Sequence, residues 1–134
     1  MKDLLKKLDA CESAIKWAGD KTWPEIYTTC ERGDWLLWLF EKTDGDKILA
    51  AKAAVKCIEP VKDVLGHKVV QAYADYSKGR ISFEELLKID TLPNMIVFGA
   101  AVMAPLKTGI PRETYLKQAA EIVRSIIPIE KFNL

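Results

Sequence analysis

The chain has 134 residues, the size of one globular domain, and a chain of this length buries about two thirds of its unfolded surface. Apolar residues make up 49% of it and charged residues 29%, a composition that excludes extended disorder. The 20 basic and 19 acidic residues leave a formal net charge of +1, which excludes a general attraction to nucleic acid or an anionic membrane. We therefore expect a single domain over residues 1–134.

The N-terminus and the cysteines both predict a reduced, cytoplasmic protein. Residues 1–7 contain no apolar stretch of signal-peptide length. The three cysteines are odd in number and widely spaced, so no pair has the C-x-x-C spacing of a metal or redox site. Because Cys11, Cys30 and Cys57 lie among apolar neighbours, we expect buried free thiols.

Apolar residues recur at intervals of three and four in the first half of the chain, which predicts helices. The run from Trp35 to Phe40 is apolar on every side, so its helix should lie in the middle of the core. A turn at Asp44–Asp46 follows, and Asp46 should cap the next helix. The helices expected in this half cover 2–18, a short segment capped by Thr22 and ending at Gly33, 35–42, and 47–58.

The second half continues the helical pattern. Ser82 and Glu85 have the spacing of a capping box, which fixes the start of one helix. Residues 95–106 carry no charge, but about 18 Å of helix is too short for a bilayer core of ~30 Å, so a buried central helix is expected. The competing interpretation is a short β-strand at Val69–Tyr73 or Ile96–Phe98. No second segment has the pattern of a partner strand, so we do not expect a sheet. The helices expected here cover 69–78, 83–89, 94–106 and 111–127.

These patterns together predict an all-α fold, a compact single-domain bundle of about seven helices, two of them largely buried (35–42 and 94–106). The Gly99-Ala100-Ala101 stretch should let a neighbouring helix approach closely.

The sequence carries no constellation of residues typical of an enzyme. The single histidine, His67, has no nucleophile in a recognisable context, and a solvated loop histidine is the simpler interpretation. The glycines are dispersed and form no phosphate-binding motif. We therefore predict no catalytic residues, no metal site and no cofactor.

Four tryptophans fall in the first third of the chain, and they are either core residues or an interface. Trp23, which precedes Pro24 at a helix start, is the best candidate for exposure. Arg32 and Asp34 flank Gly33 in an Arg-Gly-Asp tripeptide. A junction between two short helices explains this tripeptide more simply than an adhesive, integrin-binding motif does. There Asp34 is expected to cap the following helix or to pair with Arg32.

The run Cys30-Glu31-Arg32-Gly33-Asp34-Trp35-Leu36-Leu37-Trp38-Leu39 resembles the signature of a family of immunity proteins assigned to bacterial polymorphic-toxin systems. The segment from Leu8 to Ala18 is similar to the opening helix of that family, and Lys117–Arg124 with Ile127-Pro128 is similar to its closing helix. The resemblance covers most of the chain. It implies a helical protein that neutralises a toxin partner by direct binding.

Our first hypothesis is thus a protein-binding module whose partner surface includes Trp23, Arg32 and Asp34, with a protein toxin or another protein as partner and no membrane. The tail residues Ile129, Phe132 and Leu134 leave two arrangements open, a homodimer contact or packing back onto the core.

Two alternatives come from other classes. In the first, the chain is a small-ligand-binding or enzymatic helical domain with an internal apolar cavity, lined by Met95, Phe98, Met103 and the tryptophans with Cys30 or His67 as polar element. In the second, it is a phage or mobile-element protein associated with nucleic acid, although acids interrupt its lysine cluster: Lys47, Lys52, Lys56 and Lys62.

Overall fold

The computed structural model describes residues 1–43, 45–89 and 92–134, and all regular structure within these ranges is helical. The expected all-α fold is confirmed. The turn expected at Asp44–Asp46 includes Asp44, which lies outside the described residues. The helices are α1 (Lys2–Lys7), α2 (Glu12–Ala18), α3 (Trp23–Thr29), α4 (Gly33–Lys42), α5 (Lys47–Ile58), α6 (Lys62–Leu65), α7 (His67–Ser77), α8 (Phe83–Ile89), α9 (Pro93–Thr108) and α10 (Arg112–Ile126), with short 3-10 turns at Glu59–Val61 and Ile129–Lys131.

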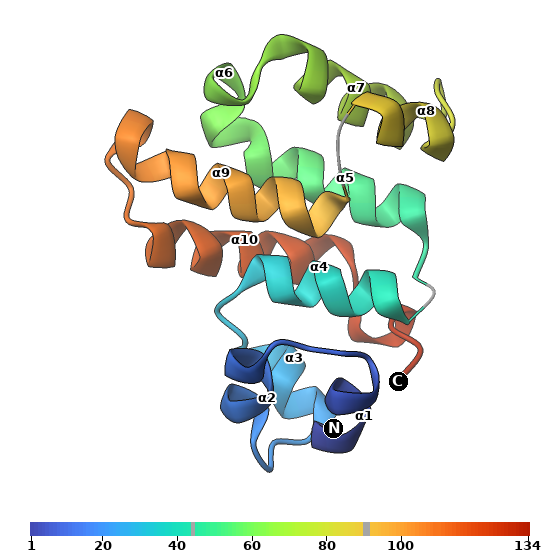
Figure 1. The fold of residues 1–134 in the computed structure, drawn as a ribbon, viewed down its shortest axis with the longest axis vertical. Coiled ribbons are helices and arrows are strands. Elements are labelled where there is room, and N and C mark those ends of the chain that lie inside the picture. The colour runs from blue at the N-terminus through green and yellow to red at the C-terminus, as the bar shows by residue number, and fades with distance from the viewer. Residues whose placement is uncertain (44, 90–91) are drawn as a thin grey trace.

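Helices α4, α5, α9 and α10 pack against one another as the body of the molecule, with α6–α8 at one end and α1–α3 at the other (Figure 1). Small residues allow this close packing, because alanine lets helix axes approach. Larger side chains, among them Leu37, Phe40, Tyr73 and Tyr115, fill the remaining space and are fully buried. The buried alanines are Ala50, Ala51, Ala53, Ala54, Ala100, Ala101, Ala104, Ala119 and Ala120.

Helices α4 and α10 approach each other closely at Gly33. A Cβ atom at this position would lie 2.6 Å from the Cβ and the backbone carbonyl carbon of Ala119, a distance that real side chains do not reach. Gly33 was expected to end the preceding helix, but that helix ends at Thr29 and Gly33 opens α4 instead. The glycine is needed here for packing rather than for a turn.

Helix α9 is buried on one face only, which corrects the expectation of a largely buried helix over 94–106. Its inner residues Ile96, Val97, Ala100, Ala101 and Ala104 are buried. The space beside Gly99 is open, so no helix of the described residues packs against this glycine. Its outer face carries an apolar row that we call the α9 stripe, with exposed fractions of 55% for Met95, 42% for Phe98, 46% for Val102 and 77% for Leu106.

By length and composition alone, Phe83–Thr108 is apolar enough to cross a membrane, and its most apolar window is 38% buried in the fold. The stretch includes residues 90–91, which lie outside the described part of the chain. A core helix of a soluble protein passes the same test, so one such stretch is weak evidence for a membrane span.

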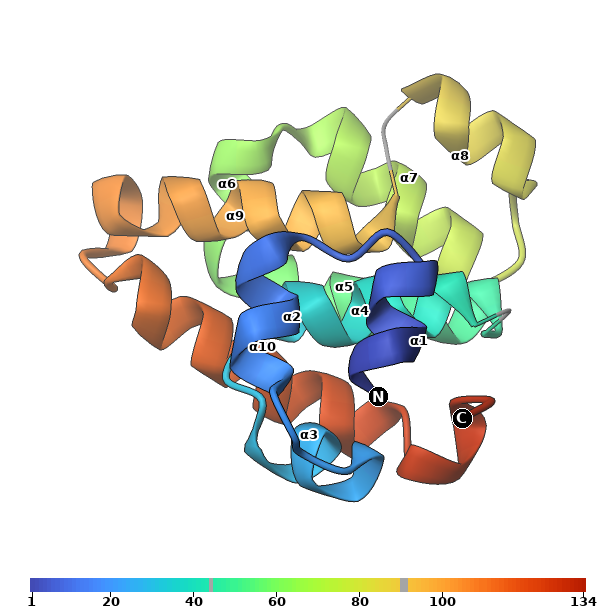
Figure 2. The same ribbon diagram turned by 60° about the horizontal axis from the view of Figure 1, so that its bottom comes forward.

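The first three helices form a small layer of their own along one side of α4 (Figure 2). The helix expected over 2–18 is divided in two at Asp9, whose backbone has φ 62° and turns the chain between α1 and α2. This extra turn and the short α6 are why the helices outnumber the seven or so expected. The capping boxes at Thr22–Glu25 and Ser82–Glu85 form as residue spacing indicates.

Candidate functional site

Arg32 and Asp34, two of the three residues expected at a partner surface, form a two-point ion pair at the start of α4. Arg32 Nε donates to Asp34 Oδ1 at 2.9 Å, and Arg32 Nη2 donates to Asp34 Oδ2 at 2.8 Å. Asp34 is only 6% exposed, and the ion pair compensates its buried charge. The capping role expected for Asp34 is wrong, because Gly33 already belongs to the helix and Arg32 holds the N-cap position.

The guanidinium of Arg32 also lies over two aromatic rings. Its Cζ is 4.5 Å from the centre of the Trp35 ring and 6.0 Å from that of Phe98 on α9. The hydrogen bond to its carboxylate partner raises the pKa of Arg32 further, so its charge is permanent. Trp17 of α2 packs against Trp35 with ring centres 6.1 Å apart. Arg32 therefore stands where the N-terminal layer, α4 and the α9 stripe meet.

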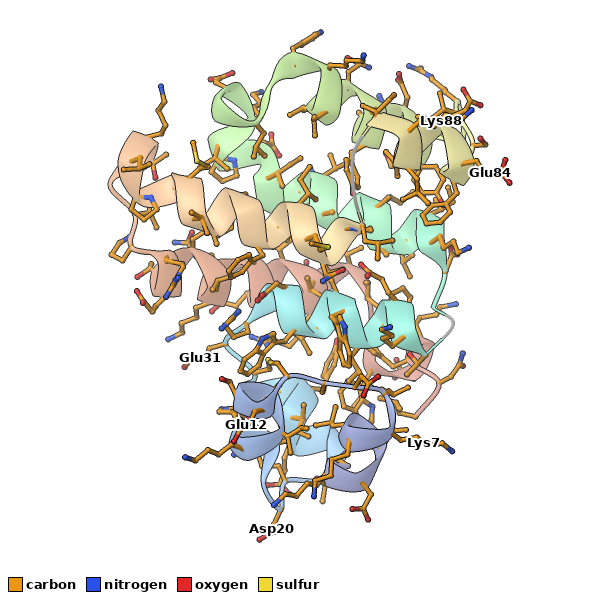
Figure 3. All side chains as sticks on the ribbon, in the orientation of Figure 1. Lys7, Glu12, Asp20, Glu31, Glu84 and Lys88 are labelled. Carbon is orange, nitrogen blue, oxygen red and sulfur yellow. The ribbon has the colours of Figure 1, made fainter. Side chains whose placement is uncertain are left out.

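The surroundings of Arg32 are partly exposed. Glu31 points outward from the segment between α3 and α4 (Figure 3), and its Oε1 lies 3.9 Å from Lys117 Nζ. Both side chains are mostly exposed, so this contact contributes little to stability. The charge of interest at this corner is therefore that of Arg32, which Asp34 holds in place.

Trp23, the third expected partner residue, has a different environment. Its ring centre lies 4.9 Å from that of Phe132 and 5.7 Å from that of Tyr27, and its side chain is partly buried. Phe132 is buried, so the tail packs back onto the core, one of the two arrangements left open by its sequence. The structure thus joins Arg32 with Asp34 and places Trp23 in the packing of the C-terminal tail.

A pocket of ≈ 280 Å³ lies between the N-terminal layer and α4, and we call it the tryptophan pocket. Its walls are mostly apolar, and residues of α1 to α4 and the start of α9 contribute to them. The side chains that distinguish it are Trp17, Trp35, Trp38, Asp9, Asp34 and Asn94.

The residues expected around an internal cavity divide into two groups. The tryptophans at 17, 35 and 38 and Cys30 do line the tryptophan pocket. Met95 and Phe98 belong to the α9 stripe, and His67 is exposed at the start of α7. Burial raises the pKa of the Cys30 thiol to about 11, which keeps it protonated and unreactive at neutral pH. Cys11, expected to be buried, is exposed because it lies in the turn that divides the first helix.

Glu41, on the last turn of α4, is a half-buried acid that residue patterns did not single out. Its Oε1 accepts a hydrogen bond of 2.9 Å from the backbone N–H of Asn94 in the first turn of α9. Burial raises the pKa of this carboxyl to about 7, and the hydrogen bond from Asn94 only partly opposes it. The sequence offered one signal for this residue: Glu41 is an acid within the segment 35–42, which was expected to be largely buried.

Within the described residues, no three His, Cys, Asp or Glu side chains gather closely enough to hold a metal ion. No known protein family, curated protein or solved structure matches the chain. The candidate site is therefore defined by its own geometry: the Arg32–Asp34 pair, the α9 stripe beside it and the tryptophan pocket behind it.

Proposed function

We propose that this chain is a protein-binding module that neutralises a protein toxin by covering it, the role implied by its resemblance to immunity proteins. The observation that carries the proposal is the α9 stripe. Its members follow one another at spacings of three and four along one face of the helix, and Leu106 is 77% exposed. A continuous apolar row in contact with water is typical of an interaction site.

The charges around the stripe indicate what kind of partner fits it. Helix α9 contains no acidic residue, and its one charged residue is Lys107 in the last turn. Arg32 lies over Phe98 at the edge of the stripe, with its charge held in place by Asp34. We expect the partner to present an apolar helix face with an acidic residue at its rim, because such a face complements both features.

The proposed surface keeps Arg32 and changes the roles of the other two expected residues. Asp34 orients Arg32 and is too buried to offer contact area. Trp23 packs on Phe132 and stabilises the tail. The contact residues are instead Phe98, Val102 and Leu106, since apolar anchors near the centre of an interface supply most of its binding energy.

The test compares a double variant, Val102→Asp with Leu106→Asp, with Leu87→Asp as matched control. Leu87 is an exposed leucine on α8, outside the stripe. Tagged wild type and both variants are used to capture proteins from the native organism, and the mass of what stays bound is measured. The proposal expects one protein at 1:1 stoichiometry with wild type and control, and none with the stripe variant.

Neutralisation is tested separately. The captured partner, expressed alone, should arrest growth, and coexpression of wild type or Leu87→Asp should restore it. Coexpression of the stripe variant should leave growth arrested. Equal capture and equal rescue by all three proteins would contradict the proposal, as would a partner without effect on growth.

A further inference from the structure

The outer face of α9 has a spacing that reads the same in both directions. Met95 is followed along this face by Gly99, Val102 and Leu106, at spacings of four, three and four residues. When two copies of the helix lie antiparallel and are centred between residues 100 and 101, Met95 comes level with Leu106 of the other copy. Gly99 likewise comes level with Val102. A two-fold dimer requires a surface that matches itself in this way.

The sizes of the side chains fit this register. Phe98 comes level with Met103 of the other copy, and both are accessible, because Phe98 is 42% exposed and Met103 is half-buried. A thioether against an aromatic ring is a favourable contact. Val102 comes level with a glycine, so the bulkiest groups meet away from the centre and the smallest residue lies close to it.

Nothing in the described chain requires a glycine at position 99. Its backbone is helical, and a Cβ atom there would meet no neighbouring atom within 4 Å. Glycine destabilises a helix interior relative to alanine. The missing side chain leaves a low point in the surface of α9, between Met95 and Val102, where the backbone of a second helix can approach closely. Gly99 is therefore the expected crossing point.

The most exposed member of the stripe faces a hollow in this arrangement. Leu106 is 77% exposed, and the residue level with it, Met95 of the other copy, lines a hollow of ≈ 420 Å³. The other apolar side chains of that hollow come from α4, α5, α8 and the start of α9: Trp38, Ala50, Phe83, Leu92 and Pro93. Each Leu106 therefore has an apolar site to fill on the other copy.

The charges on α9 favour the antiparallel direction. The row from Met95 to Leu106 is uncharged, and the charge of Arg32 at its edge is already balanced by Asp34. Lys107, the one charged residue of the helix, lies just beyond the row. In an antiparallel pair the two lysines are thirteen residues, or about 20 Å, apart along the axis, beyond the ~8 Å range of exposed charges at physiological salt. A parallel pair would place them side by side.

Each Lys107 comes level with Asn94 of the other copy, where Glu41 supplies a carboxyl group. Glu41 Oε1 accepts a hydrogen bond of 2.9 Å from the Asn94 N–H, and its half-buried side chain lines the hollow. Two lysines also line the hollow, but their ammonium groups lie over aromatic rings, at 6.0 Å from the ring centre of Trp38 and 4.4 Å from that of Phe83: Lys42 and Lys47. The cation at one end of each stripe thus approaches the acid at the other end, twice in the pair.

We propose that the free chain forms a two-fold homodimer in which the α9 stripes of two copies pack antiparallel and cross at Gly99. The self-matching spacing, the open glycine and the arrangement of charge all select a second copy of this chain. The dimer does not rest on the toxin-binding proposal, because it is a property of the chain alone. Both use the stripe, so a toxin that binds there displaces the second copy.

Sedimentation of the purified full chain over a range of micromolar concentrations tests the dimer. The mass should rise from the 15.1 kDa of one copy toward twice that value as the concentration increases. A mass that stays at one copy throughout would overturn the proposal and leave the stripe to another protein. A mass that grows past two copies would also overturn it, because it indicates open-ended association.

Gly99→Leu separates specific packing from unspecific association. The added side chain enlarges the exposed apolar surface, so unspecific association would become stronger, whereas a close crossing at Gly99 is blocked. We expect the Kd of the dimer to rise about tenfold or more. The fold should be retained, since the space beside Gly99 is open, and circular dichroism checks this.

The matched control is Gln118→Leu, which adds the same side chain at an exposed position of α10. It should leave the Kd of the dimer unchanged. A Gly99→Leu dimer as tight as that of wild type would contradict the crossing.

Cross-linking tests the direction of the two helices. In a Cys11→Ser background, which removes the exposed native thiol, copies with Met95→Cys are mixed with copies with Leu106→Cys and oxidised. The mixture should form a disulfide-linked dimer, because the two positions are level. Neither variant alone should do so, since equal positions lie eleven residues, or about 16 Å, apart along the axis, beyond the ~7 Å that a disulfide spans between Cα atoms. Cross-linking of each variant with itself, and not of the mixture, would show a parallel pair and overturn the proposal.

Discussion

The bundle and the N-terminal layer bury their apolar residues to different extents. In the bundle, α4, α5, α7, α9 and α10 share one continuous core in which most side chains are fully inaccessible. In the layer, the buried residues are Leu5, Ala18 and Ile26, which pack with Leu39 of α4, and the large aromatic side chains around them are only partly buried. The layer has filled less of its interior, and the tryptophan pocket is the result.

The layer is fixed to the bundle mainly through α3. Arg124 of α10 donates from Nη1 to the carbonyl oxygens of Cys30 at 2.7 Å and Tyr27 at 3.2 Å. In return, the Tyr27 hydroxyl donates to the carbonyl of Ile127 at 2.9 Å. No comparable bond ties α1 or α2 to α10 among the described residues. We therefore infer that α1 and α2 open at lower free energy than the bundle, as loosely packed segments do.

The largest expected difference between the two regions is in the effect of a leucine truncation. Leu37→Ala in the bundle core should lower the free energy of unfolding by about 2–5 kcal/mol, because neighbouring helices cannot collapse into the cavity. Leu5→Ala in the layer should cost less than Leu37→Ala, since Leu5 already borders open space. Urea unfolding of both variants measures the difference, and equal losses would contradict the contrast in packing.

The next largest effect is expected on the pH dependence of stability. It comes from Glu41, which connects the end of α4 to the start of α9. Burial raises its pKa from 4.5 to about 7, so between those pH values the folded chain holds a proton that the unfolded chain releases. The stability that this proton contributes is fully present below about pH 4.5 and is lost as pH rises through 7. Glu41→Gln cannot ionise and keeps an acceptor for the Asn94 N–H.

We therefore expect Glu41→Gln to exceed wild type in stability above pH 7 by about 1–3 kcal/mol, and the two proteins to converge below about pH 4.5. Urea unfolding at several pH values is the measurement. Glu84→Gln on α8, which makes the same substitution at an exposed position, serves as the control. A constant difference between Glu41→Gln and wild type at every pH would show that the carboxyl ionises normally in the folded chain.

Sequence patterns predicted most of the helices, because periodicity and capping are local properties. The capping box of Ser82 with Glu85, the cap at Thr22 and the closing helix illustrate this, since each depends on residues within one or two turns. The division of the first helix at Asp9 was missed because its apolar stripe continues through the break. The left-handed turn at Asp9 closes α1 with two local hydrogen bonds, from the Ala10 N–H to the Leu5 carbonyl oxygen at 2.9 Å and from the Asp9 N–H to the Lys6 carbonyl oxygen at 3.1 Å.

The candidate site was less predictable, since it depends on contacts between distant segments. The uncharged stretch of α9 indicated a buried helix, and composition could not distinguish its inner face from the exposed stripe. Arg32 and Asp34 were recognised as a pair because they are two residues apart. Trp23 was assigned to a partner surface because nothing local reveals that Phe132, more than a hundred residues later, covers it.

The Arg32–Asp34 pair connects the two regions, and Asp34→Ala is expected to have an intermediate effect. Loss of both hydrogen bonds should lower the free energy of unfolding by about 1–2 kcal/mol, reduced from the value for a fully buried pair because Arg32 is partly exposed. Chemical denaturation is the measurement. Glu31→Ala, which removes an exposed carboxylate from the same corner, should change stability little.

An effect of similar size is expected at the turn at Asp9, and it tests whether the layer opens independently of the bundle. Asp9→Val places a β-branched residue at φ 62° and should cost about 1–2 kcal/mol, whereas Asp9→Gly accepts that backbone and should stay close to wild type. Amide hydrogen exchange shows where the loss falls. If the layer opens alone, Asp9→Val speeds exchange in α1 and α2 and leaves the best-protected amides of α5 and α10 much less affected. Equal acceleration in all four helices would mean that the layer and the bundle unfold as one unit, despite the pocket between them.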